Sequence, residues 1–212
     1  MSPNTYIDDK TPGETGDNHE FLPELEGQNN LSKRKTTELP SILTYDEIDR
    51  LLLSIDDLEV LVAVRLMLFG GLRVSEAEAV RVKDVYRAAP PYVFVHQGKG
   101  SKDRYAPIDV ATAAIAHCYA AQSEKDPDDK LFSRSTRTLQ RAIMKAYDIA
   151  GIKDRTTHSL RHTCATWQVD RGIDIETVRE NLGHTDIATT QIYLHLNIRQ
   201  RSILYRDATR FG

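Results

Sequence analysis

The hydrophobic and polar residues of this chain recur mainly with a helical period. Residues 58–69, LEVLVAVRLMLF, are apolar almost throughout, which predicts a core helix that is buried on most of its sides. In residues 136–150, Leu139, Ile143 and Tyr147 recur every four residues, which indicates an amphipathic helix. These two segments predict a helical core.

Shorter helices are predicted from capping residues and from glycines. Thr44 and Glu47 form a capping-box pattern, which opens a helix that extends to about Ser54. Glycines follow two later helical segments, where a left-handed cap is expected. The further predicted helices are residues 74–80, residues 109–121, the segment that contains position 158 and ends at Gly172, and residues 175–182, which end at Gly183.

A short region between the helices has the composition of β-strands. Residues 92–96, YVFVH, are aromatic and β-branched, which favours a strand. Residues 97–103 are rich in glycine and lysine and would form the tip of a hairpin that returns over residues 104–108. A third strand is expected near residues 82–85. The predicted fold class is therefore mainly α with a small antiparallel β-sheet (α+β).

Composition narrows the class of protein. The 212 residues are 40% hydrophobic and 28% charged, as in a globular protein with one domain. The two cysteines lie far apart in sequence, which fits a reducing compartment and argues against a disulfide framework. The chain has no signal-peptide pattern at its start and no apolar run long enough to span a membrane, so we expect a cytoplasmic protein without a membrane partner.

The distribution of charge is more informative than the net charge of −3. Residues 130–212 carry 14 basic and 8 acidic side chains, whereas residues 41–129 carry 10 basic and 15 acidic ones. A basic C-terminal part could form a surface that faces DNA. Ordinary scatter of charges is the alternative explanation.

The candidate chemistry is concentrated in residues 157–196. His158 and Arg161 are three residues apart and would share one face of a helix. His184 follows a glycine directly, and Tyr193 lies on the next segment. A guanidinium grips two phosphate oxygens, a histidine shuttles protons near neutral pH, and a tyrosine hydroxyl can attack phosphorus. Together they indicate a phosphate-handling site.

Each of these features has a simpler explanation when it is taken alone. A histidine and arginine three apart are commonly a surface pair. His158 and His162 have the four-residue spacing of zinc ligands, but the glutamate of a His-Glu-x-x-His metalloprotease is absent. The sequence Gly98-Lys99-Gly100 joins two predicted strands and lacks the P-loop pattern. We therefore expect no metal, no nucleotide and no other cofactor.

Four motifs, in order, make the combination specific. They are GLRVSE at residues 71–76, GKGSKDR at 98–104, HSLRH at 158–162, and LGH at 182–184 followed nine residues later by Tyr193. This arrangement resembles the tyrosine recombinase (phage-integrase) family over roughly residues 40–196. The resemblance implies the fold of that family's catalytic domain and a DNA strand-exchange enzyme that forms a 3′-phosphotyrosyl bond.

The resemblance also implies the residues of the site. The implied catalytic residues are Arg73, Lys99, His158, Arg161, His184 and Tyr193. In these roles the tyrosine is the nucleophile, the arginines neutralise the phosphate oxygens, and the lysine protonates the departing oxygen. The candidate DNA-contacting residues are Lys102, Arg104, Arg137, Arg141 and Lys145.

Domain organisation and partners follow from the same resemblance. Residues 1–37 are polar and are expected to be disordered or loosely packed, which leaves no room for the N-terminal core-binding domain typical of the family. Residues 38–196 would be the catalytic domain. Residues 197–212 would form a tail that docks on a neighbouring protomer or packs on its own domain. The expected partners are double-stranded DNA and further copies of the chain, from dimer to tetramer.

Three other functions stay open from sequence. A regulator on the same fold could bind DNA without cutting it. A type IB topoisomerase-like enzyme could relax DNA without pairing two sites. A metal-dependent hydrolase is the most distant alternative.

Overall fold

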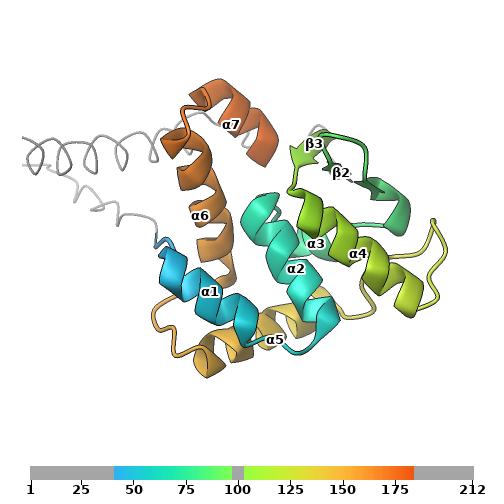
Figure 1. Ribbon diagram of the computed structural model, residues 1–212, viewed down its shortest axis with the longest axis horizontal. Helices are drawn as coiled ribbons and strands as arrows, with labels where there is room; N and C mark the ends of the chain where they lie inside the picture. Colours follow the sequence, from blue (N-terminus) through green and yellow to red (C-terminus); the bar gives the residue numbers. More distant parts are fainter. Residues whose placement is uncertain (1–40, 97–102, 184–212) are drawn as a thin grey trace, which may run out of the picture. The chain divides into compact units, whose positions relative to one another are not determined.

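The structure is a computed structural model that describes residues 41–96 and 103–183 (Figure 1). These residues lie in the compact unit Glu38–Gly212. The elements, in chain order, are α1 Tyr45–Leu53, α2 Leu58–Phe69, α3 Val74–Ala79, the 3₁₀ helix η1 Val82–Asp84, β1 Val85–Tyr86, β2 Tyr92–Val95, β3 Arg104–Pro107, α4 Val110–Gln122, α5 Thr136–Ile149, α6 Thr157–Asp170 and α7 Ile175–Leu182.

Helix α2 is the centre of the core. It packs against α3, α4, α5 and α6, and Figure 1 shows it between α6 and α4. Val62, Ala63 and Val64 point in different directions around the helix and are all completely or almost completely buried, because the helix has no continuous polar side that could face water. The core helix predicted over residues 58–69 is confirmed within the same bounds.

Two other predicted helices owe their position to local sequence. The side chain of Thr44 accepts a hydrogen bond from the backbone of Glu47 at 3.2 Å, and the carboxylate of Glu47 accepts one from the backbone of Thr44 at 2.8 Å. This reciprocal capping box fixes the start of α1. Helix α5 buries Leu139, Ile143 and Tyr147, so its predicted amphipathic pattern is confirmed.

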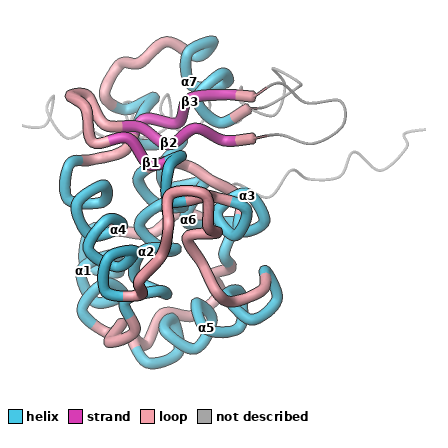
Figure 2. Tube along the Cα trace, turned by 90° about the vertical axis from the view of Figure 1, so that its right-hand side faces the viewer, coloured by secondary structure: helices cyan, strands magenta, loops and turns pink. Residues whose placement is uncertain are grey.

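The strands form one antiparallel sheet in the order β1-β2-β3. In the register of β2 and β3, Val93 lies opposite Ala106 and Val95 lies opposite Arg104. Val93, Val95 and Ala106 are buried, which makes one face of the sheet part of the core. Helix α7 packs against β3, and Figure 2 shows it beside the sheet.

The third strand differs from its prediction. Residues 82–84 form η1, and the strand is only Val85–Tyr86. The carboxylate of Asp84 accepts a hydrogen bond from the backbone of Arg81 at 2.9 Å, and the backbone amides of Val82 and Lys83 donate to carbonyls of the loop at Pro127 and Asp129. These bonds replace the ladder bonds that a longer strand would have needed.

The observed fold class is mainly α with a small antiparallel sheet, as predicted. Among the helices of the described residues, none combines the length and the apolar character that crossing a membrane would require.

Candidate active site

Three of the predicted catalytic residues line one pocket. Arg73 precedes α3, whereas His158 and Arg161 lie in the first two turns of α6. The pocket opens to solvent, and its lining residues are Met67, Leu72, Arg73, Val74, Thr157, His158 and Arg161. The fold therefore brings together an arginine and a His-x-x-Arg pair that lie more than 80 residues apart in sequence.

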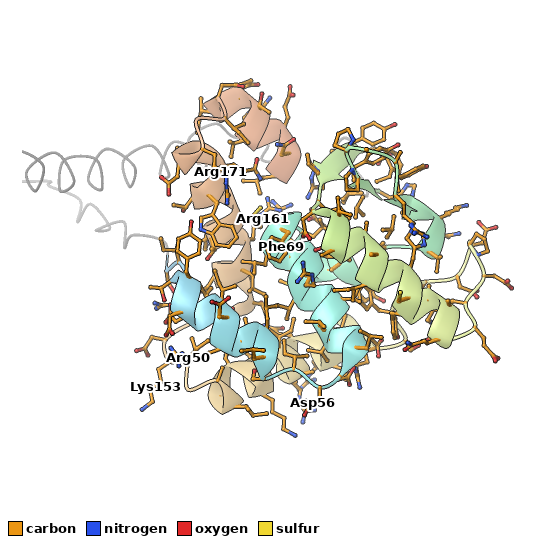
Figure 3. The ribbon with its side chains drawn as sticks, in the orientation of Figure 1. Arg50, Asp56, Phe69, Lys153, Arg161 and Arg171 are labelled. Carbon is orange, nitrogen blue, oxygen red and sulfur yellow. The ribbon has the colours of Figure 1, made fainter. Side chains whose placement is uncertain are left out.

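Arg161 is held by hydrogen bonds to two separate backbone segments. Its Nη1 donates to the carbonyl of Gly71 at 2.7 Å, and its Nη2 donates to the carbonyl of Leu182 at 2.6 Å. The side chain is 5% exposed, and Figure 3 shows it on the side of α6 that faces α2. Because a guanidinium is planar and rigid, two such bonds fix the direction in which the remaining N–H groups point.

Arg73 is more accessible than Arg161. It is the N-cap residue of α3, and its backbone N–H donates to the carboxylate of Glu76 at 2.8 Å. Its Nη1 also donates to Glu76, at 2.7 Å, while its side chain is 40% exposed. The turn before it contains Gly71 at φ +67°, a left-handed conformation that favours glycine. Arg73 thus combines a fixed backbone with a guanidinium that a ligand can reach.

Glu76 joins the two arginines, and sequence analysis assigned it no role. Its carboxylate accepts hydrogen bonds from Arg73 and Arg104 and a longer contact of 3.5 Å from Nη1 of Arg161. Burial alone would raise the pKa of this carboxyl, but the hydrogen bond and charge of Arg104, the backbone hydrogen bond of Arg73 and the charge of Arg161 together outweigh burial and hold the pKa below its usual value. Glu76 is therefore ionised at neutral pH. The spacing of Glu76 three residues after an N-cap position was the available signal.

Arg104 does not lie where the sequence placed it. It was predicted to contact DNA, but its side chain is 7% exposed. Its Nη1 and Nη2 donate to the two carboxylate oxygens of Glu76 at 3.1 and 2.8 Å, and its Nε donates to the carbonyl of Asn181 at 2.9 Å. The prediction is corrected, because this guanidinium is turned inward to a carboxylate and a helix end.

The C-terminus of α7 is held by the same cluster. The carbonyls of Asn181 and Leu182 accept hydrogen bonds from Arg104 and Arg161, respectively. Cations stabilise this end of a helix because the last carbonyls carry partial negative charge. Gly183 ends the helix, as predicted, and it does so in the left-handed conformation at φ +66°. His184 is the next residue in the sequence.

His162 lies one residue after Arg161 and is half-buried. Burial lowers its pKa, and the charges of His158 and Arg161 lower it further, so the imidazole is neutral at pH 7. Within residues 41–96 and 103–183, no three histidine, cysteine, aspartate or glutamate side chains form a group that could hold a metal ion.

The other predicted residues divide into two groups. Arg137, Arg141 and Lys145 are exposed on α5, opposite to the buried side of that helix. Lys99, Lys102, His184 and Tyr193 lie outside the described residues, as do residues 1–37 and 197–212. Their predicted roles stay predictions.

Sequence comparison finds relatives over most of the chain. A tyrosine recombinase of Pseudothermotoga lettingae is 35% identical over 178 residues, which cover 81% of this chain and 61% of the relative. Tyrosine recombinase XerD of Oceanobacillus iheyensis is 34% identical and is matched over 82% of this chain and 64% of its own length. The chain thus spans about three fifths of the length of these relatives.

Solved structures agree with this result. The crystal structure of XerA recombinase matches with a TM-score of 0.70 and 32% identity, over 80% of this chain and 65% of that one. The catalytic domain of bacteriophage HP1 integrase matches with a TM-score of 0.57 and 28% identity, over 73% of this chain and 87% of that one. The model of the phage integrase family matches residues 38–200, and the chain belongs to this family.

Proposed function

We propose that this chain is the catalytic part of a site-specific DNA recombinase that cuts and rejoins DNA through a 3′-phosphotyrosyl intermediate. The observation that carries the proposal is the pocket in which Arg73, His158 and Arg161 come together. Two guanidiniums beside a histidine are suited to a phosphodiester, because they can neutralise both non-bridging oxygens while the imidazole handles a proton.

In the proposed reaction, the hydroxyl oxygen of Tyr193 forms a bond to phosphorus while the bond from phosphorus to the 5′ oxygen breaks. Arg73 and Arg161 donate hydrogen bonds to the non-bridging oxygens as negative charge builds up in the transition state. His158 accepts the tyrosine proton and Lys99 gives a proton to the 5′ oxygen, while His184 donates a hydrogen bond to the phosphate.

The chemistry explains why the nucleophile needs this setting. A free tyrosine has a pKa of about 10, so its hydroxyl is a weak nucleophile at pH 7. Cationic neighbours favour the phenolate, and a nearby base removes the proton. The phosphotyrosyl bond retains the energy of the phosphodiester, so the reverse attack by a 5′ hydroxyl rejoins the strand without a nucleotide cofactor.

The proposed partners are double-stranded DNA and further copies of this chain. The exposed basic side of α5, with Arg137, Arg141 and Lys145, is a candidate for phosphate contacts. Lys102 lies three residues after Lys99 in the sequence, and it would add a further contact. Such contacts position a protein on the duplex without reading its sequence. Two-site strand exchange requires at least two copies on DNA.

The test is capture of the covalent adduct. The protein is incubated with a pool of nicked duplexes whose arms are randomised, so that a cut next to the nick releases a short fragment and traps the enzyme on the DNA. Tyr193→Phe removes one hydroxyl, so we expect complete loss of the adduct with DNA binding retained. An adduct formed by Tyr193→Phe would place the nucleophile elsewhere.

The same preparation separates the alternative functions. A regulator that does not cut would bind the pool without forming an adduct. A topoisomerase-like enzyme would relax supercoiled plasmid but would not exchange strands between two selected sites. A metal-dependent hydrolase would lose its activity in chelator, whereas the proposed reaction continues there.

A further inference from the structure

Arg104 lies at the base of the β2–β3 hairpin. It is paired with Val95 in the last described rung of the ladder before residues 97–102. From β3 its side chain reaches two other elements, because it donates to Glu76 of α3 and to the carbonyl of Asn181 at the end of α7. One buried guanidinium thus ties together three segments that are remote in sequence.

Arg104 and Arg161 share the same acceptor unequally. The two bonds from Arg104 to Glu76 measure 3.1 and 2.8 Å, whereas the contact from Arg161 to Glu76 measures 3.5 Å. Charge-assisted N–H···O bonds are typically about 2.7–2.9 Å long, so the contact of Arg161 is a loose one. Arg161 instead makes its short bonds to the neutral carbonyls of Gly71 and Leu182.

The longer distance from Arg161 to Glu76 affects how easily the pocket can bind a phosphate. A phosphate must compete with any carboxylate that already neutralises the arginines. The bidentate pair with Arg104 engages both oxygens of Glu76, as the bonds from Arg73 also do, and Glu76 stays at 3.5 Å from Arg161 rather than at the distance of a short ion pair. Three guanidiniums around one carboxylate leave this group of four side chains with net positive charge, and Arg161 shares the carboxylate with Arg73 and Arg104.

We propose that Arg104 is a positioning residue for the phosphate-binding arginines: it holds Glu76 in a bidentate pair and so prevents Glu76 from closing onto Arg161. The proposal rests on the proposed function for its link to DNA cleavage. Without Arg104, Glu76 would form a tight pair with Arg161, and phosphate would have to break that pair before it could bind. Loss of Arg104 therefore weakens phosphate binding although Arg104 does not touch the phosphate.

The first test measures binding of inorganic phosphate to the full chain by NMR, from backbone amide shifts of residues that line the pocket. Arg104→Met keeps the length of the side chain and removes the charge. We expect the Kd for phosphate to rise about tenfold, the effect of a typical coupling between neighbouring groups. The matched control is Arg65→Met, because Arg65 makes a partly buried ion pair with Asp109 at 2.9 Å. Its other described contacts are with Thr112 and Phe69, which do not line the pocket. Arg65→Met should bind phosphate as the wild type does.

A second variant distinguishes the proposed effect of charge from a failure of Arg104→Met to fold. In Arg104→Met/Glu76→Gln both charges of the pair are removed, and a neutral amide cannot neutralise Arg161. Replacing both partners of a buried pair is far less costly to stability than removing one. We expect this double variant to bind phosphate almost as the wild type does, whether or not Arg104→Met folds. A double variant with phosphate affinity as weak as that of Arg104→Met, or a single variant with wild-type affinity, would overturn the proposal.

The adduct assay then links the inference to cleavage. Arg104→Met should slow adduct formation about 10²-fold on a phosphodiester, as expected when a reacting group is displaced. On a methylphosphonate, in which a neutral methyl group replaces one charged oxygen, the slowing should be much smaller. Equal slowing on both substrates would contradict a charge-based role. If the wild type forms no adduct but the phosphate results hold, the proposed function is wrong and the role of Arg104 in anion binding stands.

Discussion

The two arginines of the pocket, Arg73 and Arg161, differ in how exposed they are and in the groups to which they donate hydrogen bonds. Arg73 is 40% exposed, and its described hydrogen bonds are to Glu76 three residues away. Arg161 is 5% exposed and bridges the turn at Gly71 to the end of α7. We therefore propose that Arg73 serves mainly the phosphate, whereas Arg161 serves the phosphate and also holds the fold together.

Alanine substitutions should separate these two roles. Arg73→Ala should lower the rate of adduct formation about 10²–10³-fold, as for loss of one transition-state donor, with little change in the free energy of unfolding. Arg161→Ala should lower the rate similarly and also reduce the free energy of unfolding by about 1–3 kcal/mol, because it leaves two buried carbonyls unpaired. Urea denaturation measures the second quantity, and equal stability of the two variants would contradict this division.

The lowered pKa of His162 predicts how the free energy of unfolding depends on pH. Its pKa is lowered in the folded state by burial first and by His158 and Arg161 second, so the unfolded chain takes up a proton at a higher pH than the folded chain does. Stability from this residue is therefore complete above an unfolded pKa of about 6.5 and is lost as the pH falls below it. His162→Gln should reduce the decline in free energy of unfolding between pH 7.5 and pH 5, as followed by urea denaturation. An unchanged decline would show that other groups cause it.

At the scale of elements, the turn between α2 and α3 is packed against the end of α7. A Cβ atom placed on Gly71 would lie 2.5 Å from Cδ2 of Leu182 and 3.3 Å from the sulfur of Cys164. Burial raises the pKa of the Cys164 thiol to about 11, so this sulfur is an inert part of the packing. The carbonyl of Gly71 accepts a bond from Arg161, and the close packing thus sets the position of a site residue.

Two glycine variants test this contact. Gly71→Ala should cost the roughly 1–2 kcal/mol of a left-handed alanine and, in addition, the displacement of Leu182. Gly172 has a similar φ of +81°, but no atom lies within 4 Å of a Cβ placed there, so Gly172→Ala should cost the conformational part alone. Denaturation curves of both variants give the difference. Equal destabilisation would show that α7 moves away without cost.

At the scale of the whole molecule, we predict that assembly on DNA depends on parts of the chain outside the described residues. Residues 197–212 contain Ile198, Ile203, Leu204 and Phe211, which are apolar and follow the proposed nucleophile closely. We predict that this tail contributes contacts between protomers. Packing on its own domain is the alternative.

Truncation after Asn197 tests the role of the tail. The truncated protein should bind a duplex that carries one site with the affinity of the full chain, because the phosphate-contacting residues remain. Binding to a duplex that carries two sites should lose its cooperativity, which titrations at several protein concentrations would detect. Unchanged cooperativity and unchanged recombination would argue that the tail packs on its own domain.

Local sequence was sufficient wherever a signal lies within one or two turns. The capping box of Thr44, the apolar run of α2 and the glycine after α7 predicted element ends to within a residue or two. The third strand was misjudged because a cap by Asp84 and bonds to a loop some 45 residues away shortened it. The prediction of this strand was wrong because its length depends on hydrogen bonds between residues that are far apart in sequence.

The sequence by itself determined the fold class, the family and the identity of the candidate catalytic residues, because these depend on residue type, order and spacing. The tertiary structure decided how the charges are shared. Sequence analysis made Arg104 a candidate DNA-contacting residue, and it included Glu76 in the GLRVSE motif without giving it a role. Their pairing requires β3, α3 and α7 to converge. Burial then determines how strongly the carboxylate interacts with each of the three guanidiniums, because a low-dielectric interior strengthens charge–charge interactions that water would otherwise screen.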